Sequence, residues 1–225
     1  MKALTRFKFL GPFCFRDAKY FQKAFYILVS LLEHMFQKLN IAFEIVLCLA
    51  RQPKHLRGIA QVLELSPATV LRNLDALLDK NVVDFVQEGR NKRFFLKKNL
   101  HSRNLVYMAE YYKLGKAIER YPELAVILQD VVKKISAKPV ILFGSYAKFN
   151  AKSSSDIDIY ANSENKEVKK QLSLISPKLS VKFGDFDLDT PLAREIVKDH
   201  VIVSGVEEFY EKTKFFGQAE SRGQT

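Results

Sequence analysis

Two short apolar runs, separated by a fixed spacer, constrain the fold more than any other feature of this chain. The first run, residues 139–143, is wholly apolar and ends in Gly144-Ser145, which favours a strand buried on both faces and a tight turn into a helix. After a ten-residue spacer comes Asp-Ile-Asp-Ile at residues 156–159, where acidic and apolar side chains alternate. Because side chains of a strand point to opposite faces in turn, we expect both isoleucines in the core and both aspartates on the other face. The pattern therefore predicts an α/β domain in the C-terminal half.

The polar residues of these runs suit phosphate and metal binding. A glycine lets the backbone approach a phosphate closely, a helix start offers free N–H groups, and a serine adds a hydroxyl. Asp156 and Asp158 would lie about 7 Å apart on one face of a strand, where they repel each other unless a cation lies between them. Mg²⁺ or Mn²⁺ accepts such oxygen ligands. Taken singly, the Gly-Ser pair is also an ordinary turn, and the aspartates also fit the surface of an edge strand.

Together, these residues resemble the signature of the DNA polymerase β nucleotidyltransferase superfamily, read here as GSYAKFNAKSSSDIDIY. The match is closest to the minimal nucleotidyltransferases of archaea and bacteria and covers residues 137–216. The resemblance implies that the Gly-Ser turn holds the β- and γ-phosphates of an NTP, with ATP as the default, and that Asp156 and Asp158 are catalytic and bind the metal. Lys148 is placed either to add positive charge near the triphosphate or to remain a solvated loop lysine.

The third carboxylate of the family is the point at which the sequence departs from the pattern. It is expected on a neighbouring strand at residues 179–183, where Ser180 occupies the best-matching position. Either an acid slightly later in the chain completes the site, or the enzyme is weakened or inactive. The candidates are Asp185, Asp187 and Asp189, and we assign the third catalytic carboxylate to Asp187.

A second set of elements precedes this domain and resembles a winged helix-turn-helix domain over residues 40–100, as in archaeal members of the family. Ser66 is a good N-cap and Pro67 suits a first helical position, so a helix is expected to begin there. A hairpin with a basic tip and return strand follows it. The predicted elements are helices at residues 41–49, 56–62 and 67–80 and strands at residues 82–86 and 93–96.

The helix from Pro67 is expected to bury one apolar stripe and to present its polar residues to DNA. We predict Val70, Leu71, Leu74, Leu77 and Leu78 on the buried side, and Val62 facing inward from the preceding helix. Short polar side chains would then enter the major groove while basic residues of the wing neutralise phosphates. The candidate DNA-binding residues are Thr69, Arg72, Asn73, Arg90, Lys92 and Arg93.

The charge distribution fits this division. Residues 1–100 carry seventeen Lys or Arg and eight Asp or Glu, whereas residues 101–225 carry nineteen and seventeen, so most of the net charge of +11 lies in the first hundred residues. A basic half joined to a nearly neutral one suggests a nucleic-acid-binding module, although many winged helices bind only proteins.

The whole chain is therefore expected to be an α+β protein with a winged helix-turn-helix and a nucleotidyltransferase domain that holds a small mixed sheet. Residues 1–39 are either a helical extension or an artefact of the chosen start codon. Residues 101–136 form a helical connector, and residues 217–225 a disordered tail. Cys14 and Cys48 form no paired motif, and no apolar run approaches the ~20 residues of a membrane span, so we expect a cytoplasmic protein that does not enter the membrane.

The expected function is transfer of a nucleoside monophosphate from an NTP to a hydroxyl acceptor. The acceptor is RNA, a protein side chain such as that of a toxin-type partner, or a small molecule, and a homodimer stays open. The alternative is a DNA-binding regulator whose nucleotidyltransferase domain senses a nucleotide without turning it over. The missing third aspartate favours the regulator, and the intact Gly-Ser and Asp-x-Asp motifs favour the enzyme.

Overall fold

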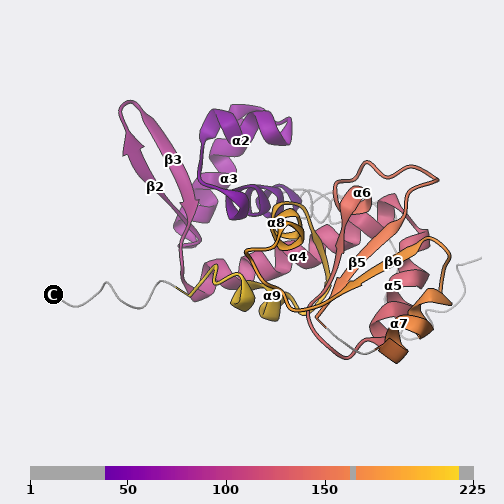
Figure 1. Cartoon of the computed structure of the whole chain (residues 1–225). Helices are drawn as coiled ribbons and strands as arrows, with labels where there is room; N and C mark the ends of the chain where they lie inside the picture. Colours follow the sequence, from indigo (N-terminus) through magenta and orange to yellow (C-terminus); the bar gives the residue numbers. More distant parts are fainter. Residues whose placement is uncertain (1–38, 163–165, 218–225) are drawn as a thin grey trace, which may run out of the picture. The chain divides into compact units, whose positions relative to one another are not determined.

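The computed structural model describes residues 39–162 and 166–217 (Figure 1). Asn40–Thr225 form one compact unit, and Met1–Leu39 belong to a separate one. The expectations for residues 1–34 and for most of the C-terminal tail lie outside the described residues. Within the described residues, no helix combines the length and the apolar composition needed to cross a membrane.

The first half of this unit combines three helices with a small antiparallel sheet. Residues 39–51 are helical, and their apolar side chains share one core with those of the next two helices; Ile45, Ile59 and Leu74 are completely buried. The strands pair in the order β1-β3-β2. The elements are β1 (Lys54–His55), α2 (Leu56–Leu63), α3 (Pro67–Asp79), β2 (Val83–Glu88) and β3 (Asn91–Leu96).

Helix α3 begins where the sequence predicts. The Ser66 hydroxyl accepts a hydrogen bond from the Thr69 amide at 3.1 Å, and Pro67 occupies the first helical position, where its missing N–H costs nothing. The helix ends at Asp79 with Lys80 as its C-cap, and Asn81 then adopts a left-handed conformation (φ 57°) that Asn tolerates better than most residues. The expected Ser–Pro start of this helix is therefore confirmed.

The buried face of α3 differs from the predicted one. Leu71 is 43% exposed, whereas Asn73 is 6% exposed and donates from its side-chain amide to the Thr69 carbonyl at 2.9 Å. Buried positions fall at Val70, Asn73, Leu74 and Leu77, the i, i+3, i+4 and i+7 spacing of a single helical face. Val70, Leu74 and Leu77 are buried as predicted. The predicted stripe has the same helical spacing, but it extended to the side of Leu71, whereas the buried face extends to the side of Asn73. Val62 of α2 is likewise 56% exposed rather than directed inward.

The predicted hairpin is present, with longer strands and a tighter turn than expected. Glu88 pairs with Asn91, so the turn consists of Gly89 and Arg90, and Gly89 has a φ of 59° that glycine adopts without strain. Strand β1, which the sequence analysis did not anticipate, pairs with β3 through Lys54 and His55. The hairpin is therefore the centre and one edge of a three-stranded sheet.

Two long helices follow, α4 (Leu100–Arg120) and α5 (Glu123–Lys134), with Pro122 as the N-cap of the second. They occupy the segment that we expected to connect the two halves. Asn99 caps α4 by accepting a hydrogen bond from the Ser102 amide at 2.9 Å. The side chains of Val106 and Ala109 share a core with both halves of the unit, so α4 is part of the packed core.

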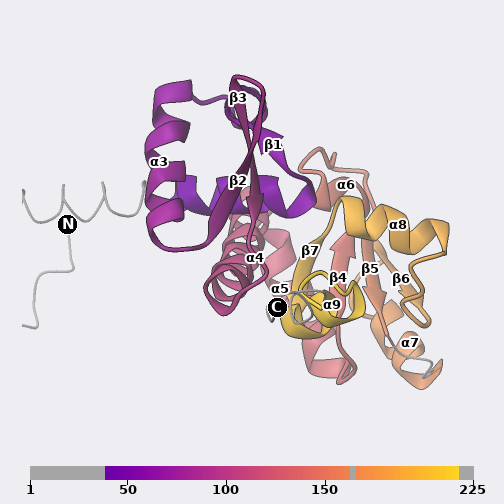
Figure 2. The same ribbon diagram turned by 90° about the vertical axis from the view of Figure 1, so that its left-hand side faces the viewer.

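The second half is built on a mixed four-stranded sheet in the order β6-β5-β4-β7, which Figure 2 shows from right to left. Strands β5 and β6 are parallel, and β4 is antiparallel to both β5 and β7, so the expected mixed sheet is present. The strands are β4 (Val140–Phe143), β5 (Ile157–Ala161), β6 (Leu179–Phe183) and β7 (Val201–Ser204), and the remaining helices are α6 (Gly144–Ala147), α7 (Lys166–Ser173), α8 (Pro191–Lys198) and α9 (Val206–Lys212).

The two faces of this sheet are covered by different helices. On one face Val140, Leu142 and Ile159 pack with side chains of α5 and α7. On the other face Ile141 and Phe143 pack with side chains of α4, α8 and α9. Because residues alternate along a strand, Asp158 of β5 lies on the same face as α8 and α9.

A buried polar network lies where α4 meets β7 and α9. The Glu110 carboxylate is 1% exposed, accepts a hydrogen bond from the Tyr210 hydroxyl at 2.9 Å, and lies 3.3 Å from the Lys113 ammonium. His200 Nε2 lies 3.5 Å from Glu110, at the outer limit of a hydrogen bond. Burial would raise the pKa of Glu110, but Lys113, His200 and Tyr210 outweigh it and lower that pKa to about 2. Glu110 is therefore an ionised buried carboxylate.

Candidate nucleotide and metal site

Gly144 connects β4 to α6 in a conformation that suits glycine. Its φ is 71°, and a Cβ placed on it would lie 2.5 Å from Oδ2 of Asp158. Real Cβ atoms do not approach another atom that closely, so the Asp158 carboxylate occupies the space that a side chain would take. The structure thus brings the Gly-Ser turn directly against one of the two aspartates.

Asp158 reaches this position through the register of the sheet. It pairs with Phe143, the last residue of β4, while its neighbours Ile157 and Ile159 are completely buried, as the alternation predicts. Asp156 comes just before β5 and is exposed, and its charge acts on the carboxyl of Asp158. The structure thus brings Asp158 against the Gly-Ser turn, whereas Asp156 precedes the strand on which both aspartates were expected.

Burial and neighbouring charges both act on the Asp158 carboxyl. Burial raises the pKa of its carboxyl, and the negative charges of Asp156 and Glu195 raise it further. A hydrogen bond from Ser180 and the charge of Lys182 oppose this effect without reversing it. The net effect is a raised pKa for the Asp158 carboxyl, with burial as its largest cause.

The position of the third carboxylate is occupied by Ser180. The strand expected at residues 179–183 is present as β6, which runs parallel to β5. Ser180 of β6 lies directly opposite Asp158, so a hydroxyl and not a carboxylate stands there. Because β6 ends at Phe183, the acids that follow lie in the loop leading to α8.

Asp187 belongs to that loop and helps to form it. Its side chain accepts a hydrogen bond from the Asp189 amide at 3.0 Å, and its carbonyl accepts one from the Thr190 hydroxyl at 2.7 Å. Among residues 39–162 and 166–217, no three carboxylate, His or Cys side chains gather into a metal-binding group. Contrary to our expectation, the structure therefore does not bring Asp187 together with Asp156 and Asp158.

Lys148 lies at the C-terminal end of α6 and is held by a residue that the sequence analysis missed. Its ammonium lies 2.8 Å from the Glu195 carboxylate of α8, and this hydrogen bond and charge raise the pKa of Lys148. The sequence predicted a helix here but gave no signal for this contact. Predicting this contact would have required knowing that α8 packs across the end of β4.

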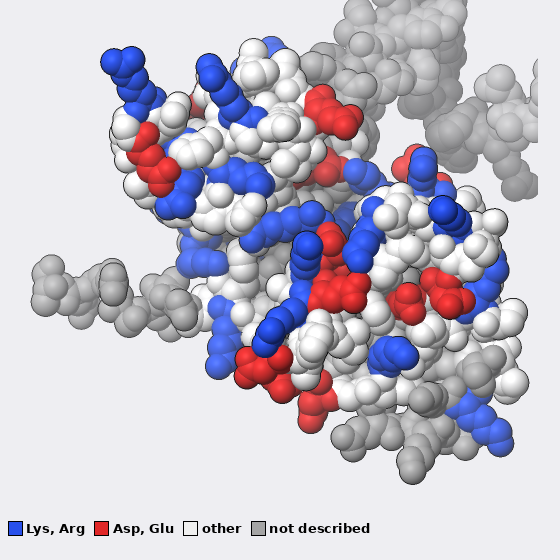
Figure 3. Space-filling view, turned by 45° about the horizontal axis from the view of Figure 1, so that its top comes forward, with Lys and Arg blue, Asp and Glu red and all other residues white. Residues whose placement is uncertain are grey.

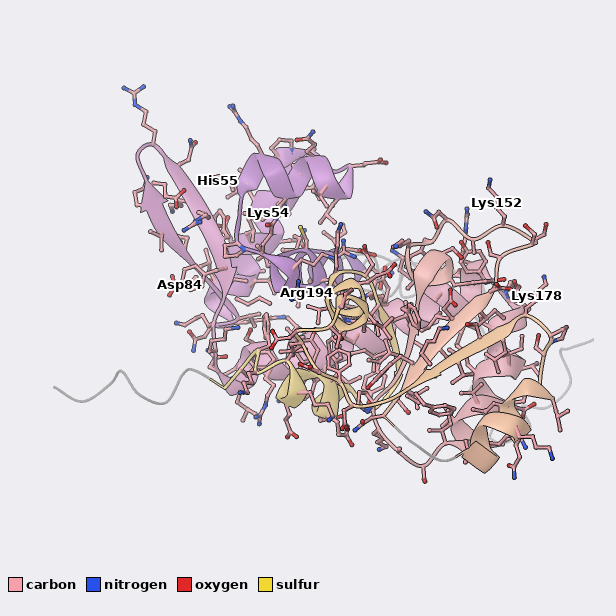
Figure 4. All side chains as sticks on the ribbon, viewed as in Figure 1. Lys54, His55, Asp84, Lys152, Lys178 and Arg194 are labelled. Atoms are coloured by element: carbon pink, nitrogen blue, oxygen red, sulfur yellow. The ribbon has the colours of Figure 1, made fainter. Side chains whose placement is uncertain are left out.

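Two hydrogen bonds donated by lysines, one from a side chain and one from a backbone amide, hold the loop between α6 and β5 in place. The Lys178 ammonium donates to the Ser153 carbonyl at 2.5 Å, and the Lys152 amide donates to the Ser155 hydroxyl at 2.9 Å (Figure 4). These contacts fix the approach of the chain to Asp156. Ser153 and Ser155 thus both take part in the turn before β5.

The candidate DNA-binding residues of α3 differ in their exposure and in their hydrogen bonds. Asn73 is buried and bonded to its own helix, so it is not available for base contact, contrary to our prediction. The Thr69 hydroxyl lies 2.8 Å from the Ser66 hydroxyl as part of the helix cap. Arg72 is exposed on α3. Of the three candidates on this helix, Arg72 is therefore the one that is exposed and not engaged in the contacts of the helix cap or the helix backbone described above.

The hairpin cations are partly neutralised. Arg93 lies 2.7 Å from Glu88, which also pairs with His55, and Lys92 lies over the Phe85 ring at 4.0 Å. Arg90 lies in the exposed two-residue turn. Figure 3 shows Lys and Arg side chains at the hairpin tip and scattered over the neighbouring helices.

No curated protein matches the chain. The family described as Polymerase beta, Nucleotidyltransferase matches residues 125–208, which run from α5 into α9 and include every strand of the mixed sheet. The match begins earlier than the resemblance seen in the sequence, since it takes in most of α5. With the Gly-Ser turn and the two aspartates at its centre, this segment is similar to a polymerase β-type nucleotidyltransferase domain.

Proposed function

We propose that the protein transfers a nucleoside monophosphate from an NTP, with ATP as the default donor, to a hydroxyl acceptor. The observation that carries this proposal is the contact between Gly144 and the Asp158 carboxylate, with Asp156 beside it. This contact supports the proposal because the turn would bind phosphate beside the carboxylates, within a segment that matches the polymerase β family.

The residues present fit a divalent metal. Asp156 and Asp158 would hold Mg²⁺ or Mn²⁺, because these ions prefer oxygen ligands and commonly bind through one or two carboxylates together with substrate phosphates. The Asp158 carboxylate lies where a Cβ of residue 144 would be, so only glycine at this position leaves room for it. When bound, the metal neutralises the charge that develops on the transferred phosphoryl group.

The protein's own residues would position the NTP. Gly144 lets the backbone approach the β- and γ-phosphates, and the Ser145 hydroxyl would donate a hydrogen bond to them. Lys148 would add positive charge on the same side. The acceptor hydroxyl then attacks the α-phosphorus and pyrophosphate leaves. The acceptor is RNA, a protein side chain, including that of a toxin-type partner, or a small molecule.

The first half of the unit would act as a winged helix that binds DNA in the cytoplasm, in a monomer or a homodimer. Its order of elements, with a capped helix followed by a hairpin that carries Arg90 and Lys92, supports this assignment. Arg72 of α3 would face the major groove, and the wing would contact phosphates.

Transfer of label from α-labelled ATP tests the enzymatic proposal. With Mg²⁺ and candidate RNA, protein and small-molecule hydroxyl acceptors, we expect labelled product from the full chain. Asp156→Asn and Asp158→Asn should each lower the rate by roughly a hundredfold or more, because several kcal/mol of charge stabilisation depend on the metal. Asp130→Asn, on the exposed side of α5, is the matched control and should keep the full rate.

One observation favours a second function. Ser180 stands opposite Asp158, where the family carries its third acid, so a domain that binds a nucleotide without turning it over also fits the site. This regulator would bind Mg-ATP, change its DNA affinity on binding, and transfer no label to any acceptor. Label transfer that is lost in Asp158→Asn excludes it.

A further inference from the structure

Helix α3 has a second face, opposite the one that it buries. Its buried residues, at positions 70, 73, 74 and 77, share one side of the helix, and its exposed residues repeat the same spacing on the other side. Because residues three and four positions apart are neighbours on a helix surface, the exposed residues form one continuous stripe. The exposed stripe consists of Ala68, Leu71, Arg72, Asp75 and Asp79.

The chemistry of the exposed stripe changes along the helix. Its N-terminal part holds Leu71 beside the cation of Arg72, whereas its C-terminal part carries the carboxylates of Asp75 and Asp79. Phosphates repel carboxylates, so a nucleic acid would approach the N-terminal part of the stripe. The side chains of a helix also lean towards its N-terminus, which directs Leu71 and Arg72 to that same end.

Leu71 adds an apolar surface to this end of the helix. Its exposed fraction is 43%, although the sequence pattern placed it in the core, and a contact that covers it would remove apolar surface from water. In the major groove of DNA, thymine alone carries an apolar group, its C5-methyl, and apolar side chains contact it. The guanidinium of Arg72, at the next position, has the geometry that binds O6 and N7 of guanine.

The charge of this half of the chain matches DNA as the occupant of the stripe. Residues 41–100 carry ten Lys or Arg against six Asp or Glu. Arg90 lies in the exposed turn of the hairpin that follows α3, where it can neutralise phosphates while α3 contacts bases. In helix-turn-helix proteins the N-terminal residues of the second helix contact the base edges, and these are the residues that the stripe exposes.

We propose that Leu71 contacts the methyl group of a thymine in the major groove, next to the base pair that Arg72 contacts. The bound sequence then contains a thymine beside a guanine, and Leu71 sets the preference for that thymine. This inference rests on the proposed DNA binding by the first half of the unit. It adds a base preference and the residue that causes it.

Removing single methyl groups from the DNA tests this contact without altering the protein. Duplexes that bind the full chain would first be selected from a random pool. Each thymine of the selected sequence would then be replaced by deoxyuridine, which lacks only the C5-methyl. We expect one such replacement in each bound sequence to weaken binding roughly fourfold, the effect of one buried methyl group, in fluorescence anisotropy at a fixed salt concentration.

The matching change in the protein completes the test. Leu71→Ala should bind the thymine and deoxyuridine duplexes equally, because its short side chain no longer reaches the methyl group. Leu174→Ala is the matched control, since Leu174 is 82% exposed in the other half of the chain, and it should keep the fourfold difference. Arg72→Ala should lower the preference for the neighbouring guanine by roughly tenfold or more. Thermal unfolding of the three variants should match that of the wild type, because all three side chains are exposed.

The results that overturn the inference differ from those that overturn DNA binding. If no deoxyuridine replacement weakens binding of the wild type, or if Leu71→Ala keeps the full sensitivity, Leu71 does not contact a thymine methyl group. The same follows if the chain binds the pool without selecting a sequence, and DNA binding stands in all three cases. If the chain binds no duplex at all, the proposed DNA binding itself fails, whereas nucleotide transfer is untouched.

Discussion

Replacing Glu110 with Gln should destabilise the protein far more than a change to a surface carboxylate. The substitution keeps the shape and an acceptor for the Tyr210 hydroxyl, but it removes the negative charge beside the buried Lys113. The pKa of Glu110 falls from an ordinary 4.5 to about 2, which corresponds to about 3 kcal/mol at 1.36 kcal/mol per pH unit. Breaking a buried ion pair by removing one partner typically costs about 3–5 kcal/mol, in the same range.

The pH dependence gives this prediction its sign. Because the pKa is lower in the folded state than in the unfolded state, ionised Glu110 contributes its full stability above pH 4.5, and that contribution is lost as the pH falls towards 2. The difference between wild type and Glu110→Gln should therefore be about 3 kcal/mol at pH 7 and roughly half of that at pH 3.

Urea unfolding followed by far-ultraviolet circular dichroism measures this difference, since the chain has no Trp. Asp130→Asn is the control, because the Asp130–Lys133 pair on α5 is exposed and should contribute less than about 1 kcal/mol. The reasoning is refuted if Glu110→Gln loses less than 1 kcal/mol at pH 7, or if its deficit is the same at pH 7 and pH 3.

Four further substitutions test local features. Gly144→Ala forces a side chain into a positive φ and against Asp158, so we expect ATP affinity to fall by roughly tenfold, measured by calorimetry, and an unchanged affinity contradicts the geometry. Ser66→Ala removes the cap of α3 and should lower the free energy of unfolding by about 1 kcal/mol in urea, while an effect near zero would show that the cap is not needed. Arg90→Ala should weaken DNA binding for all sequences and reduce the slope of its salt dependence by about one, measured by fluorescence anisotropy. Arg93→Ala should have a smaller effect, because Glu88 already neutralises the Arg93 side chain. Equal effects of the two substitutions would contradict this reasoning.

The sequence predicted those parts of the fold that depend on local signals. The Ser–Pro start of α3, the buried strand before Gly144 and the strand at residues 179–183 are all present, because capping residues and alternating apolar residues act within a few positions. The hairpin was predicted for the same reason, but the predicted turn had more residues than the two that form it in the structure, Gly89 and Arg90. Only the pairing of Glu88 with Asn91 in space defines where the turn closes.

Features that depend on packing were missed. Asn73 looked exposed because it is polar, yet the helical period places it on the buried face, where its amide bonds to the backbone of its own helix. Strand β1 has two residues and no pattern of its own, and it exists because Lys54 and His55 reach β3. The pairing of Glu195 with Lys148 joins residues that lie 47 positions apart, and it depends on how α8 crosses the sheet.

The buried carboxylate of α4 also bears on how much of the chain the matched segment needs in order to pack as it does here. The family match starts at residue 125, after α4 has ended, yet Glu110 of α4 binds Tyr210 of α9 and lies beside His200 at the start of β7. A gene fusion that copied only the matched residues would leave His200 and its sheet edge without their partner. The packed unit of this chain is therefore longer than the matched segment and includes α4.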